Sequence, residues 1–288
     1  MTSHTSSSTL IRLQAPHGPS YNLPCAVLQE MDTWEGRWAS KDVYGTGDTL
    51  QAFEAEMAVL LGKPAGLFFV SGTSAQQAAL AQHVYGEKRT PSISPFVLVH
   101  PTSHLLIHED DAIQNLLCFN VLCTKHRDRP LQANDVEEAL HTFAARATKG
   151  HKLVVMVEVP HREIGGSTTS LEDLHAIRAL VDAHNEAAGH VQVALHCDGA
   201  RLFEVMPFYA EQGATCVGDV TGIFDSIYVS FYKGIGAVTG SILCGRQAFI
   251  EGSKIWRHRY GGALYSLWPF AMHCQLKMDG MRDQGGVV

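Results

Sequence analysis

Three short segments of this 288-residue sequence carry side chains that could do chemistry together. Ser71-Gly72-Thr73 combines hydroxyls, a glycine that permits close approach and the free N–H groups of a following helix, which suits an anion such as phosphate. Asp198 follows an apolar run and could pair with a protonated ring nitrogen on a cofactor. Lys233 lies in a glycine-rich bend, where loss of solvent would favour the neutral amine that forms a Schiff base.

Each segment also has a purely structural interpretation. Ser71 could simply cap a helix, Arg201 could neutralise Asp198, and Lys233 could be a surface lysine in a flexible loop. Pyridoxal phosphate, however, needs a phosphate site, a carboxylate for its ring nitrogen and a lysine amine together. The three segments occur in that order, with Asp198 and Lys233 about 35 residues apart. Ser230 would add a further hydroxyl beside the phosphate.

The elements that must position these residues alternate along the chain. We expect strands at 66–70, 96–100, 153–159, 191–195, 225–231 and 241–244, and helices at 50–61, after residue 73 and at 170–184. Short apolar strands alternating with longer amphipathic helices predict an α/β fold, with a mainly parallel sheet between helices. Ligands of such folds bind at the carboxyl ends of the strands, which is where the three segments fall.

A run of histidines raises the alternative of a metal site. His100, His104, His108 and Glu109 would place three imidazoles on one face if they shared a helix. Pro101 directly follows the first histidine, and the preceding apolar run predicts a strand that ends there. A continuous helix is therefore not expected, and we predict no metal.

Composition excludes several other classes of protein. The sequence has 22 basic and 29 acidic residues, which argues against a nucleic-acid partner. Its apolar runs are far shorter than the ~20 residues of a membrane span. Neither 165–166 nor 234–236 completes a dinucleotide-binding glycine motif. The seven cysteines form no Cys-x-x-Cys pair, which predicts reduced, mostly buried thiols and a cytoplasmic protein; organellar targeting is the weaker interpretation of the Ser/Thr-rich start.

Six segments, taken in order, resemble the threonine aldolase and aromatic amino acid β-eliminating lyase family of fold-type-I pyridoxal phosphate enzymes. They are Asp42-Val43-Tyr44-Gly45, Ser71-Gly72-Thr73-Ser74-Ala75-Gln76, Pro101-Thr102-Ser103-His104 through Glu109, Glu163-Ile164-Gly165-Gly166, Asp198-Gly199-Ala200-Arg201-Leu202 and Ser230 to Gly236. The resemblance runs from about residue 40 to 270. It implies a fold-type-I large domain, pyridoxal 5′-phosphate as cofactor, and a homodimer or homotetramer whose subunits complete one another's sites.

The resemblance also implies a role for individual residues. Lys233 resembles the lysine that forms the Schiff base, Asp198 the partner of the ring nitrogen, and Arg201 the arginine that holds the substrate carboxylate. His104 resembles the histidine that stacks on the cofactor ring. The remaining assignments are to the phosphate and its surroundings: Ser71, Gly72, Thr73 and Ser230 at the phosphate, Arg257 as a basic residue that reaches a neighbouring subunit's phosphate, and Tyr44 near the same site.

The reaction implied is retro-aldol cleavage of a β-hydroxy-α-amino acid, of L-threonine or L-allo-threonine type, to glycine and an aldehyde. A base must remove the β-hydroxyl proton, and His104 is the first candidate; a water ordered by Glu109 or His108 is the second. β-Elimination stays open as an alternative, because it uses the same lysine, aspartate and cofactor.

The length of the chain differs from the family pattern. Members continue into a small C-terminal domain that supplies a second carboxylate-binding arginine, and a Ser-Asp-Thr run near their start is not recognisable in residues 1–35. We therefore expect an N-terminal tail or arm at 1–35, a cofactor-binding large domain at 36–255, and at 256–288 the start of a connection to an absent small domain. A catalytically impaired relative that acts as a binding or structural subunit is the alternative function.

Overall fold

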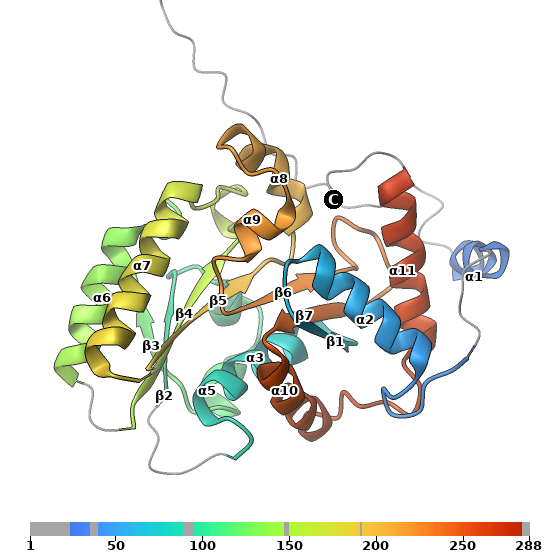
Figure 1. Ribbon diagram of the computed structural model, residues 1–288, viewed down its shortest axis with the longest axis horizontal. Helices are drawn as coiled ribbons and strands as arrows, with labels where there is room; N and C mark the ends of the chain where they lie inside the picture. Colours follow the sequence, from blue (N-terminus) through green and yellow to red (C-terminus); the bar gives the residue numbers. More distant parts are fainter. Residues whose placement is uncertain (1–23, 35–39, 89–94, 147–149, 191, 284–288) are drawn as a thin grey trace, which may run out of the picture.

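A seven-stranded sheet forms the centre of the protein in the computed structural model, which describes residues 24–34, 40–88, 95–146, 150–190 and 192–283 (Figure 1). Its strands are β1 Ala65–Phe69, β2 Pro95–Val99, β3 Asn120–Cys123, β4 Lys152–Glu158, β5 Val193–Asp198, β6 Ser226–Ser230 and β7 Ser241–Gly245. They are arranged in the order β1-β7-β6-β5-β4-β2-β3. Only β7 is antiparallel to its neighbours, so the prediction of a mainly parallel sheet is confirmed.

Helices cover both faces of this sheet (Figure 1). They are α1 Pro24–Thr33, α2 Asp48–Leu60, α3 Gly72–Tyr85, α4 His104–Ile107, α5 Ala112–Asn115, α6 Ala133–Arg146, a 3-10 turn at Arg162–Ile164, α7 Leu171–Ala188, α8 Leu202–Glu211, α9 Val217–Thr221, α10 Gln247–Arg259 and α11 Trp268–Asp283. One apolar core lies under α2, α6 to α9 and α11, and the other lies under α3, α4, α5 and α10. The central strands are therefore buried on both faces, which is why their sequences are mostly apolar, with exceptions that include His196 and Asp198 in β5 and the two serines of β6.

The observed strands differ from the expected ones at β5 and at β3. β5 continues to Asp198, so this carboxylate belongs to the last residue of the strand itself. β3 was not expected; it lies at the edge of the sheet, and its residues are exposed or only partly buried. The predicted start of the fourth strand, at residue 191, lies outside the described residues.

The chain regions near the two termini also differ from expectation. Residues 24–33 form helix α1, which lies against α11 through an ion pair between Glu30 and Lys277, where a tail was expected; residues 1–23 lie outside the described part. The predicted boundary after residue 255 falls inside α10. Four cysteines are exposed, which corrects the expectation of mostly buried thiols. In the described ranges, no helix is both long and apolar enough to cross a membrane.

Candidate active site

The carboxyl ends of β5 and β6 bring Asp198 and Lys233 into one cluster. Asp198 is the last residue of β5, and Lys233 follows three residues after the end of β6. The two strands are parallel neighbours, so their ends meet at the same edge of the sheet. Lys233 and His104 both interact electrostatically with Asp198, which is 5% exposed. The structure therefore brings together the lysine, aspartate and histidine that were predicted from sequence, while their roles stay predictions.

Asp198 is held by two hydrogen bonds from its own chain. Its Oδ2 accepts from Gln76 Nε2 at 2.6 Å, and its Oδ1 accepts from the backbone N–H of Ala200 at 3.0 Å. Burial raises the pKa of Asp198, and the charges of Lys233 and His104 act against that rise. The alternative partner, Arg201, instead pairs with Glu204 on α8, the helix that Arg201 precedes, so the structure does not support Arg201 as the counter-ion of Asp198.

His104 begins helix α4 and is oriented by two glutamates. Its Nδ1 lies 3.3 Å from Glu109 Oε1, and the proximity of this carboxylate is the main cause that raises the pKa of His104. Its backbone N–H donates to Glu158 Oε1 at 2.8 Å. With Nδ1 facing a carboxylate, the proton resides there and Nε2 is the basic nitrogen. Glu109 is buried, and its Oε2 accepts from Gln77 Nε2 at 3.0 Å.

The histidine run does not form one helix. β2 ends at Val99 and α4 begins at His104, as the proline between them predicts. His100 is occupied by Thr102, whose hydroxyl lies 2.9 Å from its Nδ1, and His108 Nε2 lies 2.8 Å from Glu163 Oε1. The described residues contain no group of three or more His, Cys, Asp and Glu side chains arranged to hold a metal.

The Ser71-Gly72-Thr73 turn caps helix α3 and presents amides of its first turn. Ser71 is the N-cap of α3, and its Oγ accepts from the N–H of Ser74 at 3.2 Å. The amides of Gly72 and Thr73 lie in the first helical turn, where N–H groups have no intrahelical acceptor. A Cβ on Gly72 would overlap the Tyr228 hydroxyl and lie 2.9 Å from that of Tyr232, so only glycine fits here. Both interpretations of this turn are therefore compatible with the structure.

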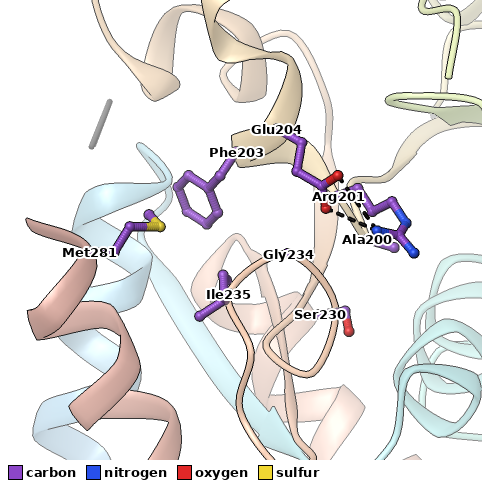
Figure 2. Close-up of a pocket in the computed structure, with 8 residues that line it drawn as sticks. All are labelled: Ala200, Arg201, Phe203, Glu204, Ser230, Gly234, Ile235 and Met281. Atoms are coloured by element: carbon purple, nitrogen blue, oxygen red, sulfur yellow. Dashed lines mark hydrogen bonds and ion pairs between the residues drawn. The ribbon is translucent and has the colours of Figure 1, made fainter. Parts of the chain in front are cut away.

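A cavity of about 110 Å³ opens between α8 and the loop that carries Lys233 (Figure 2). Its lining residues are Ala200, Arg201, Phe203, Glu204, Ser230, Gly234, Ile235 and Met281. Arg201 Nη1 lies 3.1 Å from Glu204 Oε1, and the dashed lines in Figure 2 mark this pair. The Ser230 hydroxyl is buried near Tyr228 without a well-formed hydrogen bond. The cavity thus has a polar end at the strand edge and an apolar end toward α11.

Tyr44 and Arg257 lie in a second region, near β1. Tyr44 is exposed, and its ring stands edge-on to Tyr265 with centroids 5.4 Å apart. Arg257 is 4% exposed and donates from Nη1 to the Phe68 carbonyl at 2.9 Å. Its Nη1 also lies 3.9 Å from Glu54 Oε1. In this conformation Arg257 is engaged within its own chain, which differs from the predicted reach toward a neighbouring subunit; that contact stays a prediction.

Four residues of the site were not assigned from sequence. Glu158 ends the strand next to Asp198 and is paired with it in the sheet register. Gln76 and Gln77 support Asp198 and Glu109 from α3, and Glu204 pairs with Arg201. Glu158 carries the same signal as Asp198, a charged residue that ends an apolar run. The two glutamines and Glu204 have no signal apart from the register of their helices.

Comparison with known proteins now identifies the family. The sequence profile of the beta-eliminating lyase family matches residues 37–279. Aldolase vrtJ from Penicillium aethiopicum is 33% identical over 224 residues, which cover 77% of this chain and 52% of that protein. Low-specificity L-threonine aldolase 1 from Arabidopsis thaliana is 27% identical over 226 residues, which cover 77% of this chain and 58% of that protein. The chain therefore spans about half the length of these curated relatives.

A solved structure leads to the same family. The Listeria monocytogenes protein assigned as an L-allo-threonine aldolase superposes with a TM-score of 0.74 and 34% identity, over 93% of this chain and 67% of that one. This similarity confirms the fold class predicted from sequence. The predicted cofactor, pyridoxal phosphate, agrees with the family. The chain belongs to the beta-eliminating lyase family.

Proposed function

We propose that this protein is a pyridoxal-phosphate-dependent lyase that cleaves a β-hydroxy-α-amino acid of L-threonine or L-allo-threonine type to glycine and an aldehyde. One observation carries the proposal: Lys233, Asp198 and the His104–Glu109 pair converge beside the amino end of α3. The relatives named as threonine aldolases support this class of substrate.

The residues of the cluster fit pyridoxal phosphate by their chemistry. Asp198 is a buried carboxylate that needs a positive partner, and the first turn of α3 offers amides to a phosphate. Ser230 offers a buried hydroxyl next to the same turn, since Tyr228 lies near both. Lys233 would hold the aldehyde carbon of the cofactor. When bound, the cofactor supplies an electron sink for the pair of electrons released at Cα.

His104 is the base that the structure favours. Glu109 holds the proton on Nδ1, which leaves Nε2 to take the proton of the substrate β-hydroxyl. As that proton leaves, the O–H electrons form the carbonyl of the aldehyde, the Cα–Cβ bond breaks, and Cα later takes a proton to give glycine. A water ordered by Glu109 is less favoured because both carboxylate oxygens already face Gln77 and His104. His108 is paired with Glu163.

Arg201 would hold the α-carboxylate of the substrate. Its guanidinium lines the cavity at the strand edge and is only partly exposed. A planar guanidinium binds a carboxylate through two parallel hydrogen bonds, which orients as well as attracts it. Glu204 occupies this guanidinium in the structure, so a substrate carboxylate would share or replace that partner.

The lysine assignment is tested by absorbance after addition of pyridoxal phosphate. Wild-type protein should show the long-wavelength band of a lysine-bound cofactor, and Lys233→Ala should lack it. Lys254→Ala is the matched control, because Lys254 is a surface lysine paired with Glu251 and should leave the band unchanged. A band that survives Lys233→Ala would contradict the assignment.

The reaction is tested separately by the products. Threonine or allo-threonine should yield glycine and acetaldehyde, and His104→Asn should lower kcat by about a hundredfold or more, as loss of a general base does. Release of ammonia and a 2-oxo acid instead would show that the protein is a β-eliminating enzyme. A cofactor band with no turnover would indicate the impaired binding or structural subunit.

We also propose assembly into a homodimer or homotetramer, which rests on the family resemblance and on the placement of Tyr44 on the surface. Light scattering of the purified protein should give a mass of at least two chains. A monomer at micromolar concentration would contradict this part of the proposal.

A further inference from the structure

A buried chain of hydrogen bonds leads from Asp198 to the far end of α3. Gln76 Nε2 donates to Asp198 Oδ2 at 2.6 Å, and Gln76 Oε1 lies 2.6 Å from His196 Nε2. His196 Nδ1 lies 2.7 Å from Ser226 Oγ, and Ser226 Oγ lies 2.6 Å from His83 Nε2. The chain thus links two helical and two strand residues beneath α3, and none of the three inner members is more than 1% exposed.

His83 and His196, the two histidines in this chain of hydrogen bonds, are neutral. Burial lowers the pKa of His196 to about 3 and that of His83 to about 4. A neutral imidazole has one donor nitrogen and one acceptor nitrogen, so each ring transmits the direction of its hydrogen bonds. If His196 donates from Nε2, its Nδ1 must accept.

The observed contacts then require a single direction along the whole chain. Gln76 Oε1 can only accept, so His196 carries its proton on Nε2 and accepts at Nδ1 from the Ser226 hydroxyl. Because the Ser226 hydroxyl already donates its only proton to His196, the N–H at His83 Nε2 must donate to Ser226 Oγ. Every hydrogen bond therefore points toward Asp198, and the last of them presents an N–H to its carboxylate. If every hydrogen bond pointed the other way, Gln76 would turn its Oε1 acceptor toward Asp198. The Asp198 carboxyl would then have to be protonated in order to donate to it.

We propose that His83, Ser226, His196 and Gln76 form a positioning chain that keeps Asp198 ionised and aimed at the ring nitrogen of the bound cofactor. The proposal rests on the proposed function, since it assigns the ring nitrogen to Asp198. These residues do not touch the reacting atoms. By directing an N–H group at Asp198, they stabilise the ionised form of its carboxylate relative to the protonated form.

Other charges around the chain act on the same carboxylate. Asp198 is also faced by Lys233 after β6, His104 on α4, Glu109 before α5, Glu158 on β4, Cys197 on β5 and Tyr228 on β6. The far end, at His83, is faced by Asp225, Arg246 and Lys152. Lys233 and His104 favour the ionised carboxylate, whereas Glu109 opposes it. The chain adds a neutral N–H donor at Asp198 Oδ2.

The first test reads the direction of the chain without any cofactor. In protein labelled with ¹⁵N-histidine, NMR should show His196 protonated on Nε2 between pH 6 and 8. Ser226→Ala removes the donor to Nδ1 and should let the Nδ1-protonated form appear. An Nδ1-protonated His196 in the wild-type protein would overturn the proposal.

The second test reads the ring nitrogen of the cofactor. With ¹⁵N-labelled pyridoxal phosphate, the wild-type complex should keep that nitrogen protonated to higher pH than the Ser226→Ala complex. Gln76→Leu, which removes the last donor, should have the larger effect. We expect cofactor affinity to fall about tenfold for Ser226→Ala, the loss of one buried hydrogen bond.

The control is Ser253→Ala, which removes an equally buried hydroxyl that donates to the Phe249 carbonyl in α10. It should leave both the affinity and the ¹⁵N shift of the ring nitrogen unchanged. If Ser226→Ala behaves like this control while the wild type binds the cofactor, the positioning chain is wrong and the proposed function stands. If the wild type does not bind pyridoxal phosphate, both proposals fail.

Discussion

Two buried carboxyl groups of this protein are alike in burial, in the direction of their pKa shift and in having a cation nearby, but their neighbours are arranged differently. Glu54 and Asp198 are 7% and 5% exposed, burial raises the pKa of each, and each has a cation nearby. Glu54 Oε1 accepts from the N–H of Phe68 at 2.8 Å, and its cation, Arg257, donates to the carbonyl of the same residue. The cation of Asp198, Lys233, lies on a partly exposed loop.

The difference shows what separates a structural ion pair from a candidate site. Around Glu54, both charged groups are committed to the backbone of β1 and join α2 and α10 to it. Around Asp198, the amine of Lys233 lies over the Tyr232 ring, and the first-turn amides of α3 have no acceptor within the helix. Burial and charge alone therefore do not mark a site; groups that the fold leaves available do.

The largest expected effect comes from breaking the ion pair between Arg257 and Glu54. Arg257→Leu should lower the free energy of unfolding by about 3–5 kcal/mol, because it removes a buried donor and leaves Glu54 without its cation. Urea unfolding measures this loss. Arg259→Leu, on the exposed side of the same helix, should change stability by less than about 1 kcal/mol, the worth of its contact with Trp256.

The opposite result for Arg257 would be equally informative. If Arg257→Leu left stability unchanged and weakened cofactor binding only in the assembled protein, the guanidinium would serve a neighbouring subunit's phosphate, as the family resemblance predicts. The Glu54 region would then belong to the active site, and the contrast drawn between the two carboxyl groups would be wrong.

The next effect concerns binding. Asp198→Asn should weaken pyridoxal phosphate binding by about a hundredfold, or about 2.7 kcal/mol, because it removes the charge opposite a protonated ring nitrogen. Its effect on unfolding should be small, because the raised pKa shows that the folded chain gains little from this charge. Absorbance titration and urea unfolding give the two numbers. A large loss of stability with unchanged affinity would make Asp198 a structural residue like Glu54.

Much of the candidate site at the carboxyl edge of the sheet was predictable from the sequence, because it depends on local rules. Parallel strands end at one edge of a sheet, so Asp198 and Lys233 were expected together once their strands were recognised. The apolar runs are long enough to show these strands, and Pro101 separates β2 from α4 as expected. The strand-to-helix turn at Gly72 was predictable because such a turn has a recognisable composition.

The supporting residues were not predictable for an equally physical reason. Gln76 and His196 meet across 120 positions of sequence, and only the packing of α3 on β5 brings them together. Arg257 was assigned to a neighbouring subunit's phosphate from the family resemblance, and the partners that it has within this structure come from β1 and α2. Glu158 is the exception: a charged residue at the end of an apolar strand was visible, and the same rule that selected Asp198 applied to it.

The pH dependence of stability that Glu158 contributes gives a further test of the comparison between Glu54 and Asp198. Burial and the nearby Asp198 raise the pKa of Glu158 to about 8, whereas the unfolded chain has a value near 4.5. The folded state therefore holds a proton that the unfolded state has lost, so this contribution to stability is full below pH 4.5 and is lost as pH rises toward 8. Glu158→Gln should remove this dependence and gain on the order of 2 kcal/mol relative to wild type between pH 5 and pH 8.

The measurement is the difference between the two unfolding curves, because other groups titrate in both proteins. Glu54 loses stability over the same range, and His83 and His196 lose it as pH falls below about 6.5. These contributions cancel in the difference. A difference that stays constant from pH 5 to pH 8 would mean that Glu158 is ionised in the folded protein and that Asp198 has a charged neighbour.

The smallest expected effect lies at the partly exposed end of the site. Arg201 and Glu204 are 19% and 14% exposed, and such a pair contributes below about 1 kcal/mol to stability, so Glu204→Gln should leave unfolding nearly unchanged. The substrate carboxylate would then meet an uncommitted guanidinium, and KM should fall by roughly threefold with kcat preserved, since this is ground-state binding. A rise in KM would instead mean that Glu204 orients Arg201, because an ion pair that positions a ligand-binding group costs binding when it is broken.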